Sequence, residues 1–376
     1  MLLTSGSGVR RSAAIFLLPI LAACCSSAQQ QQQQQQQRVV PFRKAKLMHE
    51  PSYLSLAKLN TLASLTNVDH MNEVLDNVCI PRVVGTPGHK QVREYITSSL
   101  KNFNWTVEND EFEDYTPVFG RIKFENIIAK YNPNAKRYLT LACHYDSKYE
   151  QKYDFIGATD SAVPCMQLIN LAKVMEKQLK SIKERDVSLM LLFLDGEEAF
   201  KQWGPKDSIY GARHLAAKWH KNQYTYGTEN GISDLDKIDL FVLLDLIGAP
   251  NPTFYNYFSD TSKWYSLMSK SESILAKMRQ FEKYSYGIPQ RKYFQDYTIT
   301  AGIQDDHLPF LEKNVPILHL IPYPFPDFWH TEGDNRNAID LATVENLNKI
   351  LRVFVASYLN VQVQEENVQS TERSEL

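Results

Sequence analysis

Two adjacent carboxylates stand directly behind a long apolar run. The run covers residues 187–194, and Asp195-Gly196-Glu197-Glu198 follows it at once. A buried strand that ends in this way brings charge to the edge of a core, which is costly unless a metal or a proton-transfer role compensates it. Neighbouring side chains on an extended segment point in different directions. One of Glu197 and Glu198 can therefore bind a metal while the other faces a substrate.

Three residues from separate segments suit a zinc site. Asp160, Glu198 and His330 offer two carboxylates and an imidazole without cysteine, the donor set of hydrolase-type zinc sites that keep a position open for substrate. Each residue also has an ordinary structural alternative. Asp160 could cap the helix that follows it, Glu198 could be a solvated loop acid, and His330 could be held by backbone groups at the edge of the core. These alternatives weaken when the three residues are considered together.

Three further acids are candidates for proton transfer. Glu197 is the candidate general acid–base, because it would lie beside the metal; its alternative is a surface carboxylate. Asp245 follows a strongly apolar run and is a second metal ligand, a proton-relay acid or a satisfied buried acid. Asp305 lies in the segment 304–307, which belongs either to the site or to a solvated turn that caps a helix around 308–312.

Large aromatic side chains are dense near these acids. Trp203, Phe325, Phe328 and Trp329 could line a pocket that excludes water. Ordinary loop packing would explain them equally well.

The elements that must position these residues alternate between strands and helices. Near-continuous apolar runs indicate central strands that are covered on both faces. The predicted strands are 125–131, 138–143, 187–194, 238–244 and 315–321, and the predicted helices are 53–75, 87–100, 162–180, 208–221, 262–281 and 341–359. The alternation predicts a three-layer α/β/α sandwich with a mostly parallel central sheet. Ligands of such sheets bind beyond the carboxyl ends of the strands, where the candidate residues converge.

The ends of the chain differ from its middle in composition. Arg10-Arg11, an apolar run and small residues indicate a secretory signal over 1–28, with a signal anchor as the alternative. We expect a Gln-rich disordered linker at 29–50, a catalytic domain at 51–361 and a polar tail at 362–376. The 376 residues are 43% hydrophobic, which suffices for a large core. The net charge of −2 gives no reason to expect nucleic acid or an anionic membrane as partner.

Three of the five cysteines lie beyond the predicted signal. In an oxidising compartment Cys143 and Cys165 are the better pair for a disulfide, because they flank one strand–loop–helix unit; alternatively all three, Cys79 included, are buried thiols. Asn104 opens a glycosylation sequon, which is compatible with secretion.

Long, ordered stretches of the chain resemble one known family, the glutaminyl-peptide cyclotransferases, or secreted animal glutaminyl cyclases. The matching stretches are 144–148, 157–165, 193–200, 207–211, 243–254, 304–311 and 318–331, so that the resemblance spans about residues 50–360. It implies a zinc aminopeptidase-like fold, in agreement with the sandwich predicted above. The glutamine tract departs from the family pattern, and Cys79 matches no family feature.

The resemblance implies a role for each candidate residue. It places one zinc on Asp160, Glu198 and His330, makes Glu197 the general acid–base, and makes Asp245 and Asp305 hydrogen-bonded acids of the site. It implies a Cys143–Cys165 disulfide. The pocket residues that it implies are Trp203, Ile303, Gln304, Phe325 and Trp329.

The implied reaction is the cyclisation of an N-terminal glutamine to pyroglutamate with loss of ammonia. We expect peptides and proteins with N-terminal glutamine as substrates, a monomeric enzyme in the secretory pathway, and no stable membrane insertion after signal cleavage. Two alternatives stay open. A di-zinc aminopeptidase on the same fold would use Asp160 as a bridge, with His144 and Asp245 on the second ion. A non-catalytic binding module would be expected to have lost a ligand or the acid, yet the sequence keeps all of them.

Overall fold

The computed structural model describes residues 41–227, 229–286 and 292–364. The predicted signal and the glutamine tract lie outside these residues, as does most of the predicted tail. The chain divides into two units, residues 1–48 and 49–376. The described residues of the first unit include the helix α2 (Phe42–Leu47), which lies within the stretch predicted as linker.

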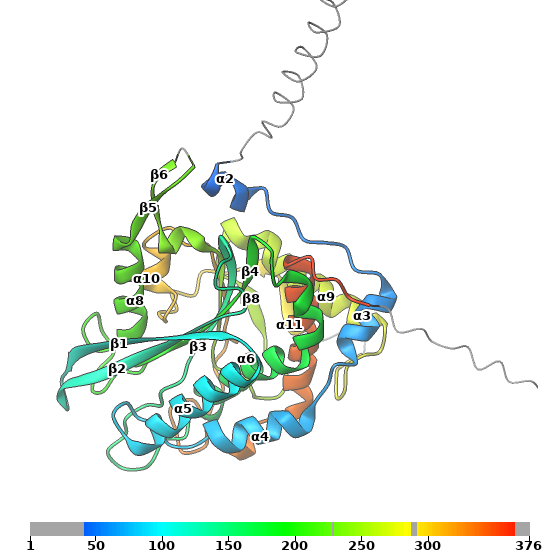
Figure 1. The fold of residues 1–376 in the computed structure, drawn as a ribbon. Helices are drawn as coiled ribbons and strands as arrows, with labels where there is room; N and C mark the ends of the chain where they lie inside the picture. Colours follow the sequence, from blue (N-terminus) through cyan, green and yellow to red (C-terminus); the bar gives the residue numbers. More distant parts are fainter. Residues whose placement is uncertain (1–40, 228, 287–291, 365–376) are drawn as a thin grey trace, which may run out of the picture. The chain divides into compact units, whose positions relative to one another are not determined.

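A six-stranded mixed sheet forms the centre of the second unit (Figure 1). Its strands are β1 (Thr106–Thr116), β2 (Gly120–Lys130), β3 (Arg137–His144), β4 (Val187–Leu194), β7 (Ile238–Leu244) and β10 (Ile317–Leu320). They lie in the order β1-β2-β4-β3-β7-β10. The last four of this order are mutually parallel, whereas β1 and β2 form an antiparallel hairpin that joins them through β4. The mostly parallel sheet is therefore confirmed.

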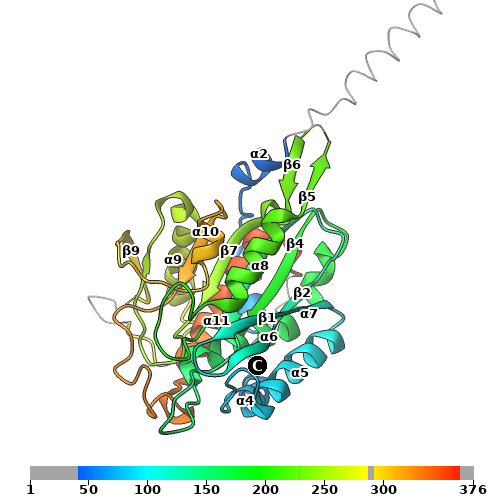
Figure 2. The ribbon, with the colours of Figure 1, turned by 90° about the vertical axis from the view of Figure 1, so that its left-hand side faces the viewer.

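Helices cover both faces of this sheet. The helices on one face are α4 (Val68–Val78), α5 (Pro87–Asn102), α6 (Val163–Val174) and α11 (Leu341–Tyr358). Beside α11 lie α3 (Leu56–Ala63) and α9 (Ser262–Lys277). The helices on the other face are α8 (Tyr210–Lys221) and the short α10 (Leu308–Leu311). Figure 2 views the molecule from the α8 side, with the sheet behind that helix. The three-layer sandwich is confirmed.

The central strands are mostly apolar because each contributes side chains to two cores. In β3, Leu139 and Leu141 pack into the cluster under α6 and α11, while Tyr138 and Ala142 pack into the cluster under α8. Successive side chains of a strand point to opposite faces, so a strand that is covered on both sides cannot alternate with polar residues. The burial of both faces fixes the sheet as the rigid layer from which the site residues emerge.

The structure differs from the sequence prediction in several elements. The predicted helix 53–75 is two helices, because Asn67 begins a second one by accepting the amide of His70 on its side chain. The edge strand β1 was missed, since its exposed acids hide the strand period. Two small sheets were also missed, formed by β5 (Gln223–Tyr226) with β6 (Glu229–Ser233) and by β8 (Phe254–Asn256) with β9 (Phe294–Thr298). α7 (Glu176–Leu179) continues the predicted helix 162–180 as a separate turn.

The edge strand is tied to α8 through the buried Asp110. Its carboxylate accepts hydrogen bonds from Lys218 Nζ at 2.6 Å and Asn126 Nδ2 at 3.0 Å, and His214 lies 3.4 Å away. Burial alone would raise the pKa of Asp110, but the bonds from His214, Lys218 and Asn126 outweigh it and lower the pKa to about 2.

Replacing this acid should destabilise the fold in a pH-dependent way. We expect Asp110→Ala to lower the free energy of unfolding by about 1–3 kcal/mol at pH 7. Because the folded-state pKa lies below the ordinary value of 3.8, the contribution is complete above that pH and is lost as the pH falls toward about 2. Urea unfolding of both proteins at pH 7 and at lower pH tests this, with Glu113→Ala on the same strand as the exposed control. An equal loss at all pH values would contradict the assignment.

Candidate active site

The candidate residues meet at the carboxyl ends of three adjacent parallel strands. His144 is the last residue of β3, Glu197 and Glu198 follow β4, and Asp245 follows β7. Because these strands are neighbours in the order β4-β3-β7, their exits lie side by side on one edge. The prediction that these segments converge is confirmed by the sheet order.

A buried carboxylate holds the Glu197–Glu198 turn in place. The two oxygens of Asp146 accept the backbone amides of Glu197 at 3.1 Å and of Glu198 at 3.2 Å. Gly196 precedes the pair with a φ of +67°, and a Cβ on it would lie 2.5 Å from the ring of Phe124. The chain can therefore turn sharply behind β4 only with glycine here, and the turn brings both glutamates inward.

Asp160, Glu198 and His330 form one group of potential metal ligands. His330 Nε2 lies 3.3 Å from an oxygen of Asp160 and 3.3 Å from an oxygen of Glu198, and one ligand atom of each residue lies within 4.8 Å of the others. Neither Glu198 oxygen has a hydrogen-bond partner among the described residues, although both are buried. Their charged neighbours are His330 at 3.3 Å and Lys148 at 3.6 Å. Buried oxygens that lack hydrogen bonds fit a bound cation, and two carboxylates with one imidazole are ligands that zinc takes.

The ordinary alternatives for these three residues do not match the structure. Asp160 lies in the segment η1 (Ala158–Ala162) with a non-helical backbone (φ −116°, ψ 75°), and its side chain caps neither η1 nor α6. Glu198 is only 3% exposed, so it is not a solvated loop acid. The side chain of His330 faces two carboxylates and not backbone groups. The three residues together have the arrangement of a group that could hold a metal ion.

A second group shares Asp160 with the first. His144 Nε2 lies 3.0 Å from Asp160 and 3.4 Å from Asp245, and these three residues also present atoms within 4.8 Å of one another. His144 does not line the cavity described below, whereas all members of the first group do. All three members of the first group therefore face the cavity, whereas the second group reaches it only through Asp160 and Asp245.

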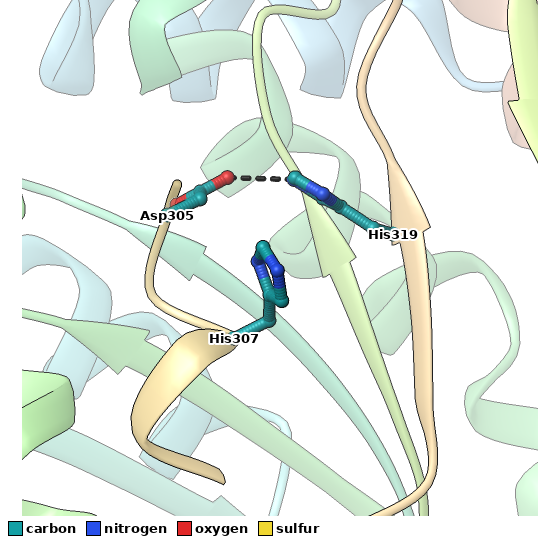
Figure 3. Close-up of side chains that lie close together, drawn as sticks. All are labelled: Asp305, His307 and His319. Carbon is teal, nitrogen blue, oxygen red and sulfur yellow. Dashed lines mark hydrogen bonds and ion pairs between the residues drawn. The ribbon is translucent and has the colours of Figure 1, made fainter. Parts of the chain in front are cut away.

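A third group lies behind the site, where Asp305 meets two histidines (Figure 3). Asp305 Oδ2 lies 2.7 Å from His319 Nε2, and the rings of His307 and His319 are 4.5 Å apart. Burial lowers the pKa of both histidines to about 3, so that they stay neutral. A neutral His319 that carries its proton on Nε2 donates it to an ionised Asp305. The segment 304–307 is thus no solvated turn, because its residues from Asp305 to His307 are buried.

Glu197 and Asp245, which both line the cavity described below, have a raised affinity for protons. Burial, the charge of Glu198 and the charges of Asp305 and Asp306 raise the pKa of Glu197 well above its usual range, although His144 opposes them. Burial and the neighbouring Asp160 and Asp305 raise the pKa of Asp245 to about 7. Buried acids whose pKa is raised in this way are candidates for general acid–base chemistry.

One cavity of about 500 Å³ opens over these groups. Its walls include all five predicted pocket residues, namely Trp203, Ile303, Gln304, Phe325 and Trp329, together with Lys148 and Tyr323. Trp203 donates its indole N–H to Gln304 Oε1 at 2.8 Å, and Trp329 stacks on His330 with ring centroids 4.1 Å apart. Phe328 does not line this cavity. The size suits a small polar group in an apolar enclosure.

The cysteines depart from what the family resemblance implied. All three described cysteines are free thiols, so the Cys143–Cys165 disulfide is not formed in the structure. Cys165 Sγ instead donates to the carbonyl oxygen of His144 at 3.0 Å, and burial and the neighbouring Cys165 raise the pKa of Cys143. Asn104, the sequon residue, is exposed just after α5.

Sequence reasoning gave no function to several residues that hold the site together. Three of them, Asp146, Lys148 and His319, lie in the stretches that resemble the family. A histidine within an otherwise apolar strand is unusual, so His319 could have been singled out from the sequence. Arg82 and Asp334 have no such signal, because their partners are backbone groups distant in the sequence.

Comparisons with known proteins agree with this geometry. The model of peptidase family M28 matches residues 126–355. The chain is 52% identical to a glutaminyl-peptide cyclotransferase of Drosophila melanogaster, over 84% of this chain and 87% of that one. It is 44% identical to the glutaminyl-peptide cyclotransferase of Bos taurus, over 86% of this chain and 91% of that one. The crystal structure of Macrostomum lignano glutaminyl cyclase superimposes with a TM-score of 0.75 at 35% identity, covering 83% of this chain and 95% of that one.

Binding of Zn²⁺ to the first ligand group should stabilise the protein. We expect Zn²⁺ in large excess over its dissociation constant to raise the thermal unfolding midpoint of the metal-stripped protein by about 5 °C or more, because a ligand that binds only the folded state stabilises it. Glu198→Ala should lose most of this gain, whereas the exposed Glu332→Ala should keep it. Differential scanning calorimetry measures both. An undiminished gain in Glu198→Ala would remove Glu198 from the ligand set.

Proposed function

The chain belongs to the glutaminyl-peptide cyclotransferase family, within peptidase family M28, and we propose that it converts N-terminal glutamine of peptides and proteins to pyroglutamate with release of ammonia. One observation carries this proposal beyond the family membership. A proton-accepting acid, Glu197, and an open metal-ligand group share a single small aromatic cavity. An intramolecular attack of an amine on a side-chain amide requires both a group that transfers the proton and a group that polarises the carbonyl.

Asp160, Glu198 and His330 would hold one zinc ion in this enzyme. When bound there, zinc supplies a Lewis acid that polarises the side-chain amide carbonyl of the substrate. Lys148 lies 3.6 Å from Glu198 and lines the cavity, so it helps to balance the negative charge of the ligands.

Glu197 moves the proton that the reaction must transfer. A bond forms between the α-amino nitrogen and the side-chain carbonyl carbon, and the bond from that carbon to the amide nitrogen breaks. The amine loses a proton as it attacks, and the departing nitrogen must gain one to leave as ammonia. Glu197 faces the same cavity and can accept the first proton and donate it to the leaving group.

Asp245 and Asp305 support this transfer as hydrogen-bonded acids. Asp245 lines the cavity, and its pKa of about 7 lets it carry a proton to which substrate groups can bond. Asp305 lies behind it and is fixed by the bond from His319. The pair would hold the polar groups of the intermediate while Glu197 exchanges the proton.

The aromatic walls would hold the substrate in a folded conformation. Trp203, Ile303, Gln304, Phe325 and Trp329 surround the space above the ligands. A flexible glutamine side chain confined there stays close to its own amine, which removes much of the entropic cost of ring closure. Later residues of the peptide would project toward solvent, so the enzyme should tolerate many sequences after the first residue.

We also propose that the enzyme acts as a monomer in the secretory pathway. The features that support secretion are the positive flank, apolar run and small-residue exit over residues 1–28 and the exposed sequon at Asn104, which we propose is glycosylated. Within the described residues, no helix has the length and apolar character needed to cross a membrane.

A di-zinc aminopeptidase is the second candidate, because His144, Asp160 and Asp245 form another ligand group beside the first. Metal analysis of the purified protein separates the two. We expect about one zinc per chain for the cyclase. A content near two, with His144→Ala returning it to one, would favour the aminopeptidase.

The activity is tested directly by mass spectrometry of a synthetic peptide with N-terminal glutamine. We expect the peptide to lose the mass of one ammonia in the presence of the protein, to stay intact with a zinc chelator, and to react again when zinc is restored. Release of free glutamine would instead identify an aminopeptidase. An unchanged peptide would indicate a binding module.

The role of Glu197 is tested by a change that removes only its basicity. We expect Glu197→Gln to lower kcat by about a hundredfold or more while zinc content stays at the wild-type level, since a general acid–base contributes about this much. Glu332→Gln, an exposed acid outside the cavity, should keep full activity. A Glu197→Gln protein that retains zinc and full activity would refute the assigned role.

A further inference from the structure

Two buried side chains of opposite charge hold the loop that carries Asp160, and neither enters the proposed chemistry. Arg82 precedes α5 in the chain, and Asp334 follows His330 by four residues. Each is only 1% exposed, and neither lines the reaction cavity. Charges buried this deeply are costly unless their partners are well placed, so the contacts that they make point to their role.

Arg82 binds only backbone carbonyls in the described part of the chain. Its Nε donates to Tyr145 O at 2.8 Å, its Nη2 donates to Gly157 O at 3.0 Å and Asp160 O at 3.4 Å, and its Nη1 donates to Ile80 O at 3.3 Å and to Ile156 O. Three of the five acceptors belong to the loop 156–160. The planar fork of the guanidinium therefore fixes this loop against the segment that follows β3.

Asp334 binds the same loop through its amides. Its two carboxylate oxygens accept the N–H groups of Thr159 at 2.8 Å and of Asp160 at 3.2 Å, and its backbone carbonyl accepts the N–H of Ala158 at 3.1 Å. The N–H of Asp160 thus meets a carboxylate while its carbonyl meets a guanidinium. Both peptide groups that flank the Asp160 side chain are held by charge-assisted hydrogen bonds.

We propose that Arg82 and Asp334 are positioning residues that set zinc affinity by fixing the backbone of Asp160. Through them, the segments that carry His144, Asp160 and His330 are joined by backbone contacts, independently of any ion. The proposal rests on the zinc site proposed above. It assigns to each residue an effect on metal binding and not merely on folding.

The loop has little freedom to adapt if one of these contacts is lost. Gly157 has a φ of +58°, and a Cβ there would lie 2.1 Å from the carbonyl oxygen of Asp160. The carbonyl that Arg82 holds is therefore packed against the chain itself. Metal–ligand distances tolerate only about 0.2 Å of error, so a small shift of this backbone displaces the Asp160 carboxylate from its place beside Glu198 and His330.

The role of Arg82 in zinc affinity is tested by Arg82→Lys, with Arg352→Lys as its matched control. Arg352 is equally buried and donates to Leu62 O, Ala63 O and Glu345 in another part of the core. We expect Arg82→Lys to weaken Zn²⁺ binding by about ten- to a hundredfold, because partners of metal ligands have effects of this size, and Arg352→Lys to leave it unchanged. Zn²⁺ affinity is measured by competition with a chromogenic chelator on the full chain, alongside the unfolding midpoint of the metal-free protein.

Asp334→Asn tests the acid with an independent control. An asparagine amide can accept only one of the two N–H groups and presents its own N–H₂ to the other. Glu272→Gln is the control, since the buried Glu272 likewise accepts two successive amides, of Tyr293 and Phe294. We expect only Asp334→Asn to weaken Zn²⁺ binding and to alter the visible absorption spectrum of the Co²⁺-substituted protein.

The outcomes separate this proposal from the one on which it rests. If Arg82→Lys or Asp334→Asn lowers the unfolding midpoint as its control does but binds Zn²⁺ with wild-type affinity, the positioning role is overturned and the residue is structural. If Arg82→Lys does not fold, Asp334→Asn decides. If the wild-type protein itself binds no Zn²⁺ through Asp160, Glu198 and His330, the zinc site of the proposed function fails instead.

Discussion

Buried negative charge is the constraint around which the site is organised. Seven carboxylates lie within the protein at one edge of the sheet, all of them at most 6% exposed: Asp146, Asp160, Glu197, Glu198, Asp245, Asp305 and Asp306. Like charges in a medium of low dielectric cannot all remain ionised, so they must share protons or cations. The structure sorts them by their partners. Asp160 faces two histidines, which lower its pKa, whereas Glu197, Asp245 and Asp306 have raised values. The first kind suits a metal ligand and the second kind suits a proton carrier.

The sheet can carry this concentration of charge at one edge because its central strands are held firmly by the core on both faces. β3, β4 and β7 lie side by side and are packed on both faces, so the positions of their last residues are determined by the whole core. The loops that follow these strands are in turn held in place by buried side chains. Asp146 holds the turn after β4, and Arg82 and Asp334 hold the loop before α6, in each case through backbone groups. Side chains that carry chemistry are thus placed by side chains that do not.

The sequence predicts the parts of this arrangement that have a local signal. Apolar runs reveal β3, β4 and β7, and the acids directly behind them show where the site must be. The edge strand β1 has no such run, because one of its faces meets solvent, and so it was missed. The cluster of Asp305 and His319 could not be distinguished from a solvated turn, since the burial of that segment depends on contacts between residues 14 apart. Arg82 lies farther still from its partners, 78 residues before Asp160, and its acceptors are carbonyl groups, which every residue has. Pairings of this kind are determined by tertiary structure and leave no pattern in the chain.

The two neighbouring ligand groups are subject to the same balance of charge. Asp160 belongs to both ligand groups, so the second group differs from the first only in His144 and Asp245. A second cation would need Asp245 ionised, but burial and the charges of Asp160 and Asp305 raise its pKa to about 7. A proton on Asp245 competes with a metal there, and His144 can itself supply a positive charge, because its bonds to Asp146, Asp160 and Asp245 overcome burial and raise its pKa. The first group behaves alike, because the contacts of His330 with Asp160 and Glu198 outweigh burial and raise the pKa of His330 to about 10. A cation would therefore have to displace protons at either group, and of the two it is the first group whose members all line the cavity.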